Sequence, residues 1–142
     1  MEIKKGRCLC SKVNYQISAE PVATRICWCR DCQYLAANGT VNIVVLSTEL
    51  NIEGSLKMFA KTADSGNVIE RRFCPDCGTQ LFANSSARPQ FTVVRVGTLE
   101  NPSSVNPSAK IWASSAPAWA CLDAEGEQRS QQPGTPQIQP KI

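Results

Sequence analysis

The 142-residue chain contains no histidine. This absence removes the most common general base and the most common nitrogen ligand for metal ions. Any metal bound by the protein must therefore be held by sulfur or oxygen. Long apolar runs are missing as well, and residues 1–6 lack the apolar core of a signal peptide. We therefore expect a cytoplasmic protein without a membrane-spanning segment.

Charge of either sign is also scarce. The formal net charge is only +3, and the lysines and arginines are scattered apart from the pair Arg71-Arg72. The sequence therefore does not indicate a nucleic-acid partner. Apolar residues make up 42% of the chain, which is within the range of globular proteins. A chain of this length can form one domain with a substantial core.

What the chain has in abundance is cysteine, with eight residues. Seven of them fall into short clusters: Cys8 and Cys10, then Cys27, Cys29 and Cys32, then Cys74 and Cys77. In a reducing compartment, clustered cysteines bind metal ions more often than they form disulfides. The clusters therefore predict metal sites.

The hydrophobic pattern indicates a mainly β fold. Residues 12–19 alternate between apolar and polar, residues 41–46 form an apolar β-branched run, and residues 56–61 and 68–73 flank a turn signal at residues 64–67. One or two short helical turns are expected over residues 30–37.

Trp112 and Trp119 are expected to pack in the core of this domain, which we place at residues 1–126. The remainder, residues 127–142, is a polar tail rich in proline and glutamine, which we expect to be disordered or loosely packed.

Cys8, Cys10, Cys74 and Cys77 form a Cys-x-Cys and a Cys-x-x-Cys-Gly motif. Structural zinc ions take four such ligands in a tetrahedron, and a metal site of this kind contributes free energy to folding. The alternatives are disulfides or free core thiols, but Cys-x-Cys spacing is awkward for a disulfide between its own two sulfurs. We therefore predict a structural zinc site.

Cys27, Cys29 and Cys32 have no obvious fourth partner. Three protein ligands and one open position are typical of catalytic zinc, where a bound water or thiol loses its proton near neutral pH. The resulting thiolate can attack an electrophilic carbon. Two alternatives remain open at this stage: Cys121 closes the site as a fourth ligand, or the three thiols form a redox cluster without metal.

Three neighbours of these thiols have more than one possible role. Asp31 can accept or relay a proton or be solvated, and Arg30 can offset thiolate charge, meet a substrate carboxylate or lie on the surface. Trp28 can line a pocket or belong to the core.

Five motifs occur in an order that resembles one family: Gly6–Cys10, Cys27–Cys32, Phe73–Phe82, Val96–Leu99 and Ala116–Trp119. The sequence resembles the glutathione-dependent formaldehyde-activating enzyme family, which includes centromere protein V. The resemblance implies a tent-like β fold with two zinc ions, a structural one at Cys8, Cys10, Cys74 and Cys77 and a catalytic one at Cys27, Cys29 and Cys32. It also implies a carbon–sulfur lyase reaction in which glutathione and formaldehyde combine reversibly to S-hydroxymethylglutathione.

Two positions depart from the family pattern. Leu9 and Lys110 stand where many members have histidine, and neither position is among the zinc ligands. If the late histidine assists the substrate, Lys110 changes that contribution. The competing hypotheses are a non-catalytic zinc module that binds a protein or nucleic acid, and a thiol redox or metal-handling protein.

Overall fold

A computed structural model describes residues 2–120 and 127–138 of the chain. Within these ranges the fold is mainly β, as predicted, with one short α-helix and several 3-10 turns. The elements are β1 (Lys4–Arg7), β2 (Asn14–Ile17), β3 (Ala23–Cys27), α1 (Arg30–Ala36), β4 (Thr40–Leu46), η1 (Ser47–Glu49), β5 (Leu50–Glu53), β6 (Lys57–Thr62), β7 (Val68–Phe73), β8 (Gln80–Ser85), β9 (Phe91–Arg95), η2 (Val96–Thr98), η3 (Pro102–Ser104), β10 (Ala109–Ile111), η4 (Ala113–Ser115) and β11 (Glu127–Gln128).

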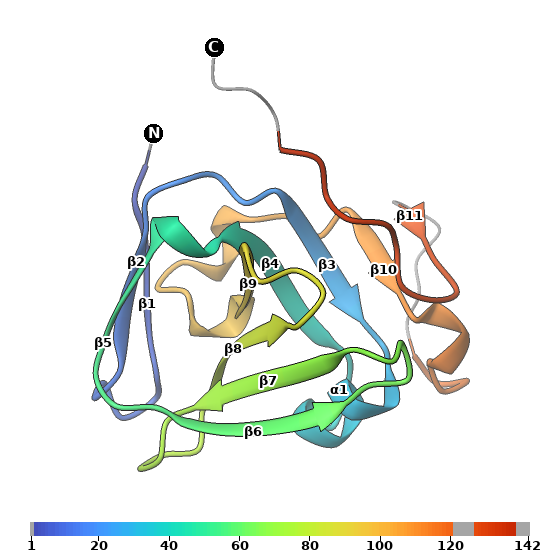
Figure 1. Ribbon diagram of the computed structural model, residues 1–142, viewed down its shortest axis with the longest axis horizontal. Helices are drawn as coiled ribbons and strands as arrows, with labels where there is room; N and C mark the ends of the chain where they lie inside the picture. Colours follow the sequence, from blue (N-terminus) through green and yellow to red (C-terminus); the bar gives the residue numbers. More distant parts are fainter. Residues whose placement is uncertain (1, 121–126, 139–142) are drawn as a thin grey trace.

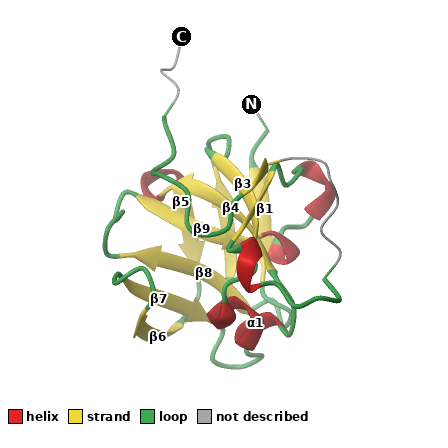
Figure 2. Ribbon diagram, turned by 90° about the vertical axis from the view of Figure 1, so that its right-hand side faces the viewer, coloured by secondary structure: helices red, strands yellow, loops and turns green. Residues whose placement is uncertain are grey.

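The strands form two sheets (Figures 1 and 2). The smaller is antiparallel, in the order β1-β2-β5, and the larger has the order β11-β10-β3-β4-β9-β8-β7-β6. Strand β10 runs parallel to both of its neighbours, whereas the other pairs in the larger sheet are antiparallel. The expected hairpin over residues 56–73 is confirmed as β6–β7.

The main hydrophobic core lies between the smaller sheet and one face of the larger sheet. Tyr15 and Ile17 of β2 are buried together with Ile43 of β4 and Phe82 of β8. The Tyr15 and Phe82 rings meet edge to face, with their centroids 5.2 Å apart. Gly6 permits this packing, because a Cβ there would lie 2.2 Å from the Tyr15 ring. The alternation predicted for residues 12–19 therefore gives the core face of β2.

The opposite face of the larger sheet carries a different set of side chains. Cross-strand partners share a face of a sheet, and the register pairs Arg25 with Asn42 and Asn42 with Arg95. The next row on this face contains Val44 and its partner Val93. Because side chains alternate along a strand, the residues between these rows point to the core and the rows themselves line a pocket.

The tail, which we expect to be disordered or loosely packed, is ordered in part: β11 pairs with β10, and the Arg129 N–H donates to the Lys110 carbonyl at 2.7 Å. Most of residues 127–138 are exposed, in agreement with loose packing. One expectation about the C-terminal part is wrong. Trp119 was expected in the core but is 69% exposed and contacts Trp28 edge to face. Trp112 is partly buried. The domain boundary at residue 126 stays a prediction.

The longest helix in the described ranges, α1, has seven residues. No helix there reaches the length and apolarity that crossing a bilayer requires.

Candidate metal centres and active site

The four cysteines predicted to hold a structural zinc lie together. Cys8 and Cys10 come from the turn between β1 and β2, and Cys74 and Cys77 from the turn between β7 and β8. Their Sγ atoms all lie within 4.8 Å of one another, with 3.5 Å between Cys8 and Cys10 and 3.7 Å between Cys10 and Cys74. A zinc–sulfur bond of about 2.3 Å gives a tetrahedral edge of about 3.8 Å. The four sulfurs therefore fit a zinc ion.

The turn after β7 is built to present its two sulfurs. Gly78 adopts a φ of +75°, which favours glycine, and its N–H donates to the Cys74 carbonyl at 2.9 Å. The Thr79 hydroxyl accepts a hydrogen bond from the Leu9 N–H and lies 3.1 Å from the Cys77 sulfur. Hydrogen bonds from Thr79 lower the pKa of Cys77 to about 5, which favours the thiolate that binds metal.

The second cysteine set lies where β3 meets α1. Cys27 is the last residue of β3, Cys29 is the N-cap of α1, and Cys32 is in its first turn. Their Sγ atoms also lie within 4.8 Å of one another. None of the seven cysteines in the described ranges forms a disulfide. This set of soft donors also fits zinc, with one tetrahedral position left for another ligand.

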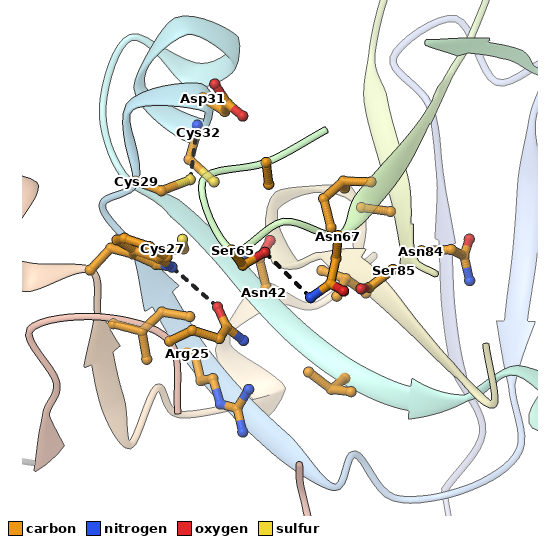
Figure 3. A pocket seen from close by; sticks show the side chains of 18 of the residues that line it. Arg25, Cys27, Cys29, Asp31, Cys32, Asn42, Ser65, Asn67, Asn84 and Ser85 are labelled. Carbon is orange, nitrogen blue, oxygen red and sulfur yellow. Dashed lines mark hydrogen bonds between the residues drawn. The ribbon is translucent and has the colours of Figure 1, made fainter. Parts of the chain in front are cut away.

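The three thiols form part of the wall of a pocket of about 190 Å³ (Figure 3). Its floor is the face of the larger sheet described above, with Val44, Ala83 and Val93 as the apolar part. The polar part of the lining includes Asn42, Asn67, Asn84, Ser65, Ser85 and five arginines, Arg25, Arg30, Arg71, Arg88 and Arg95. The pocket therefore combines thiols, an apolar floor and an excess of positive charge.

A hydrogen-bonded chain connects one of these arginines to the thiols. Buried Arg95 donates through Nη1 to Asn42 Oδ1 at 2.6 Å, and Asn42 Nδ2 donates to the Thr40 hydroxyl at 2.9 Å. Hydrogen bonds from Cys27 and Cys29 lower the pKa of Cys32, and the Thr40 hydroxyl and the charge of Arg95 act in the same direction. The pKa of Cys27 rises correspondingly, through its hydrogen bonds to Cys29 and Cys32. The Thr40 hydroxyl and the charge of Arg95 thus favour the thiolate form in this cluster.

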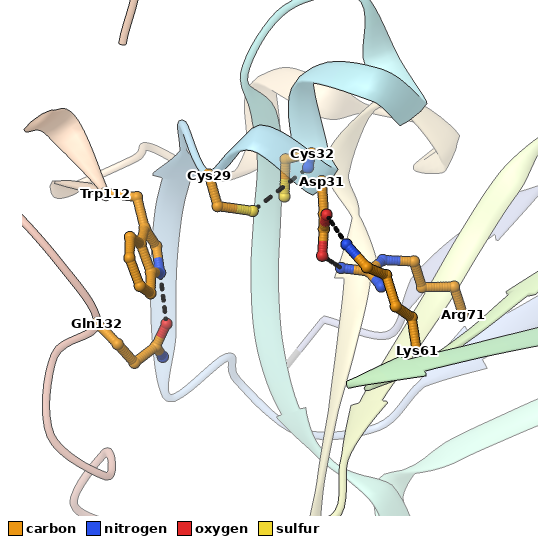
Figure 4. A network of polar contacts seen from close by, with 7 residues as sticks. All are labelled: Cys29, Asp31, Cys32, Lys61, Arg71, Trp112 and Gln132. Atoms are coloured by element: carbon orange, nitrogen blue, oxygen red, sulfur yellow. Dashed lines mark hydrogen bonds and ion pairs between the residues drawn. The ribbon is translucent and has the colours of Figure 1, made fainter. Parts of the chain in front are cut away.

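Asp31 forms ion pairs beside the thiols (Figure 4). Its carboxylate lies 2.6 Å from Lys61 Nζ and 3.7 Å from the buried guanidinium of Arg71. These contacts connect α1 to the β6–β7 hairpin. Of the roles considered for Arg30, the surface role fits its contacts best, because it donates to Gln33 Oε1 and stacks over the exposed ring of Tyr34.

The remaining predicted residues lie elsewhere. Trp28 is buried and outside the pocket lining, which agrees with its assignment to the core. Lys110 is buried on β10 and is not part of the pocket lining, whereas its neighbours Ile111 and Trp112 are. Leu9 is 79% exposed. Cys121, the possible fourth ligand, lies outside the described residues.

Sequence reasoning considered Arg30 but missed the other four arginines of the pocket and the contribution of the tail. Gln132 accepts a hydrogen bond from Trp112 Nε1 at 3.1 Å, and both Gln132 and Pro136 line the pocket (Figure 4). One signal was available in the sequence: Arg25 is two residues before Cys27 on a strand and must share its face.

Comparison with known proteins supports the fold. A crystal structure of a Rhodobacter sphaeroides protein, from a structural genomics programme, matches 72% of this chain and 91% of its own length. The TM-score is 0.57 and the sequence identity is 23%, so this likeness concerns the fold alone. No curated protein matches the chain significantly.

The family comparison is more extensive. The model of the family described as "Glutathione-dependent formaldehyde-activating enzyme" matches residues 3–115. Both cysteine sets lie inside this match, and the tail that lines the pocket lies beyond it. Because the match covers most of its length, the chain belongs to the glutathione-dependent formaldehyde-activating enzyme family.

Proposed function

We propose that this protein is a zinc-dependent carbon–sulfur lyase that acts on adducts of a thiol and an aldehyde, such as S-hydroxymethylglutathione. In this proposal Cys8, Cys10, Cys74 and Cys77 hold a structural zinc, and Cys27, Cys29 and Cys32 hold a catalytic one. The observation that carries it is the second set: three buried or half-buried thiols that open onto a pocket.

A zinc ion in this second set would supply a Lewis acid that lowers the pKa of a substrate thiol. In the forward direction the substrate sulfur adds to the carbonyl carbon of the aldehyde and a carbon–sulfur bond forms. The carbonyl oxygen becomes a hydroxyl, and the proton lost by the thiol balances the one gained by this oxygen. The reverse direction breaks the same bond and releases thiol and aldehyde.

The protein groups around the thiols suit this chemistry electrostatically. Three thiolates and a divalent cation carry one net negative charge, and a substrate thiolate adds a second. The buried guanidinium of Arg95 places a positive charge beside them, and its bond to Asn42 keeps it there. The apolar floor at Val44 and Val93 excludes water from one side of the reacting groups.

The test is metal content together with turnover on the full chain, purified under reducing conditions, as wild type and as Cys121→Ser. We expect two zinc ions per chain in both proteins, and accelerated exchange between glutathione, formaldehyde and their adduct, measured by NMR. Two ions in the wild type but one in Cys121→Ser would make Cys121 a ligand and favour a structural module. Two ions in both proteins without any acceleration on thiol–aldehyde pairs would contradict the lyase assignment.

A further inference from the structure

The positive charge of the pocket exceeds what its own acids can neutralise. Five arginines line it, against two carboxylates, Asp31 and Asp64. Asp31 is already paired with Lys61 and Arg71. Since burying charge is costly without a partner, the remaining arginines indicate where a negatively charged ligand would be stabilised.

Three of the five arginines bind partners within the protein through their guanidinium groups. Arg30 binds Gln33, Arg71 pairs with Asp31, and Arg95 binds Asn42 beside the thiols. The other two, Arg25 of β3 and Arg88 of the turn between β8 and β9, are half-buried.

The backbone of Arg25 pairs within the larger sheet, but its guanidinium makes no hydrogen bond or ion pair in the part of the chain that the structure describes. The guanidinium of Arg88 donates to the Pro133 carbonyl at 3.2 Å and to no other group in those residues. That bond satisfies a donor and neutralises no charge.

Arg25 and Arg88 line the same pocket. Burial lowers the pKa of Arg25, and repulsion from Arg88 lowers it further. Glu127 opposes this effect, but it is exposed and its carboxylate already binds Arg129. Two guanidinium groups that line one pocket, with no ion pair to a carboxylate among the residues that the structure describes, form a site for an anion. The planar fork of arginine matches a carboxylate in particular.

We infer that Arg25 and Arg88 bind a carboxylate of the substrate, so that the pocket selects thiol compounds that carry one. This inference rests on the proposed function of the site. The spacing between Arg25 and the thiols supports this inference. Arg25 and Cys27 lie on the same face of β3, two residues apart, which is about 7 Å along the strand. A thiol whose carboxylate is a few bonds from its sulfur can therefore reach both groups.

The experiment compares acids with their neutral derivatives as ligands of the zinc-loaded full chain. The probes are glutathione with its diethyl ester, and 3-mercaptopropionate with its amide, with Kd measured by calorimetry. The proteins are wild type, Arg25→Gln, Arg88→Gln and the control Lys57→Gln, which removes one positive charge from the exposed strand β6 outside the pocket. Circular dichroism and zinc content verify that each variant is folded and loaded.

We expect wild type and Lys57→Gln to bind at least one acid about tenfold or more tightly than its neutral derivative. Arg25→Gln and Arg88→Gln should lose most of this preference while binding the neutral derivative as the wild type does. If neither acid is preferred by the wild type, or if both arginine variants keep the preference, the inference is wrong.

The two proposals can fail separately. Carboxylate selection that depends on Arg25, without any lyase turnover, would contradict the proposed function and support this inference. Turnover that is equally fast on esterified and free acids would support the function and contradict the inference.

Discussion

The backbone N–H of Cys32 donates a hydrogen bond to the sulfur of Cys29 at 3.3 Å, so a predicted metal ligand is also the N-cap of α1. Serine is a better N-cap than most residues, and its hydroxyl can accept the same bond. Serine is also a far poorer zinc ligand than a thiolate. A substitution of Cys29 by serine therefore separates the metal from the helix.

We expect Cys29→Ser to bind one zinc per chain instead of two, to lose lyase turnover and to remain folded. Elemental analysis, the adduct-exchange assay and circular dichroism measure the three results. A variant that keeps both metal ions and full activity would show that Cys29 is not a required ligand.

Cys77→Ser should affect folding far more. The four-thiol set ties the turn between β1 and β2 to the turn between β7 and β8, more than sixty residues away in sequence. Because metal binding at such a set contributes directly to folding, its loss should cost about 3 kcal/mol or more and lower Tm by about 10 °C. Thermal unfolding followed by circular dichroism tests this. Equal destabilisation by Cys29→Ser and Cys77→Ser would mean that both sites are structural.

Much of the fold follows from local sequence, and the pocket does not. The alternation around Tyr15 identifies the strand and its core face, and the motif of Cys74 and Cys77 predicts a knuckle that the structure contains. Arg95, however, becomes a neighbour of the thiols only because β9 pairs with β4 in one register. Such long-range pairing is set by the whole core, so no local pattern around residue 95 indicates it.

The contacts of the tail could not be predicted from local sequence either. Its composition is poor in groups that bury apolar area, which favours disorder when the segment is considered alone. In the structure it is held by backbone hydrogen bonds to β10 and by the bond between Trp112 and Gln132. These bonds depend on an unpaired strand edge, which composition does not reveal.

Arg95 offers a third prediction, on metal affinity. Arg95→Met removes the buried positive charge and leaves Asn42 Oδ1 without its donor. Mutation of a residue that supports metal ligands typically lowers metal affinity by about 10- to 100-fold. In Arg95→Met the three-thiol site should therefore release its zinc at a correspondingly lower chelator concentration than in the wild type. Arg95→Lys keeps the positive charge, so its zinc affinity should fall less than that of Arg95→Met. Identical zinc release from wild type and both variants would contradict a role of Arg95 at the site.

A fourth prediction concerns the ion pairs of Asp31. Arg71 is buried, and Asp31→Asn would leave its guanidinium without a counter-charge. We expect a loss of about 2 kcal/mol in the free energy of unfolding, measured with urea. Lys61→Gln, the matched control, removes the exposed partner and should change stability much less. If the control destabilises as much as Asp31→Asn, the exposed pair matters more than the buried one.

The last prediction is a pH dependence at Tyr15. Burial raises the pKa of this phenol to about 12, from an ordinary value near 10, because the charged form is disfavoured in the core. A group whose pKa is raised in the folded state contributes stability that is fully present below the unfolded pKa and is lost as pH rises through the folded pKa. Wild-type stability should therefore fall by about 2 to 3 kcal/mol between about pH 10 and pH 12.

Tyr15→Phe isolates this effect. At neutral pH the variant should be less stable by about 1 kcal/mol, because it loses the 2.7 Å hydrogen bond to Thr98. Its stability should then fall less steeply in alkali, since phenylalanine has no proton to release. Urea unfolding of both proteins at pH 8, 10 and 11.5 gives the comparison, and parallel losses in the two proteins would assign the alkaline transition to other groups.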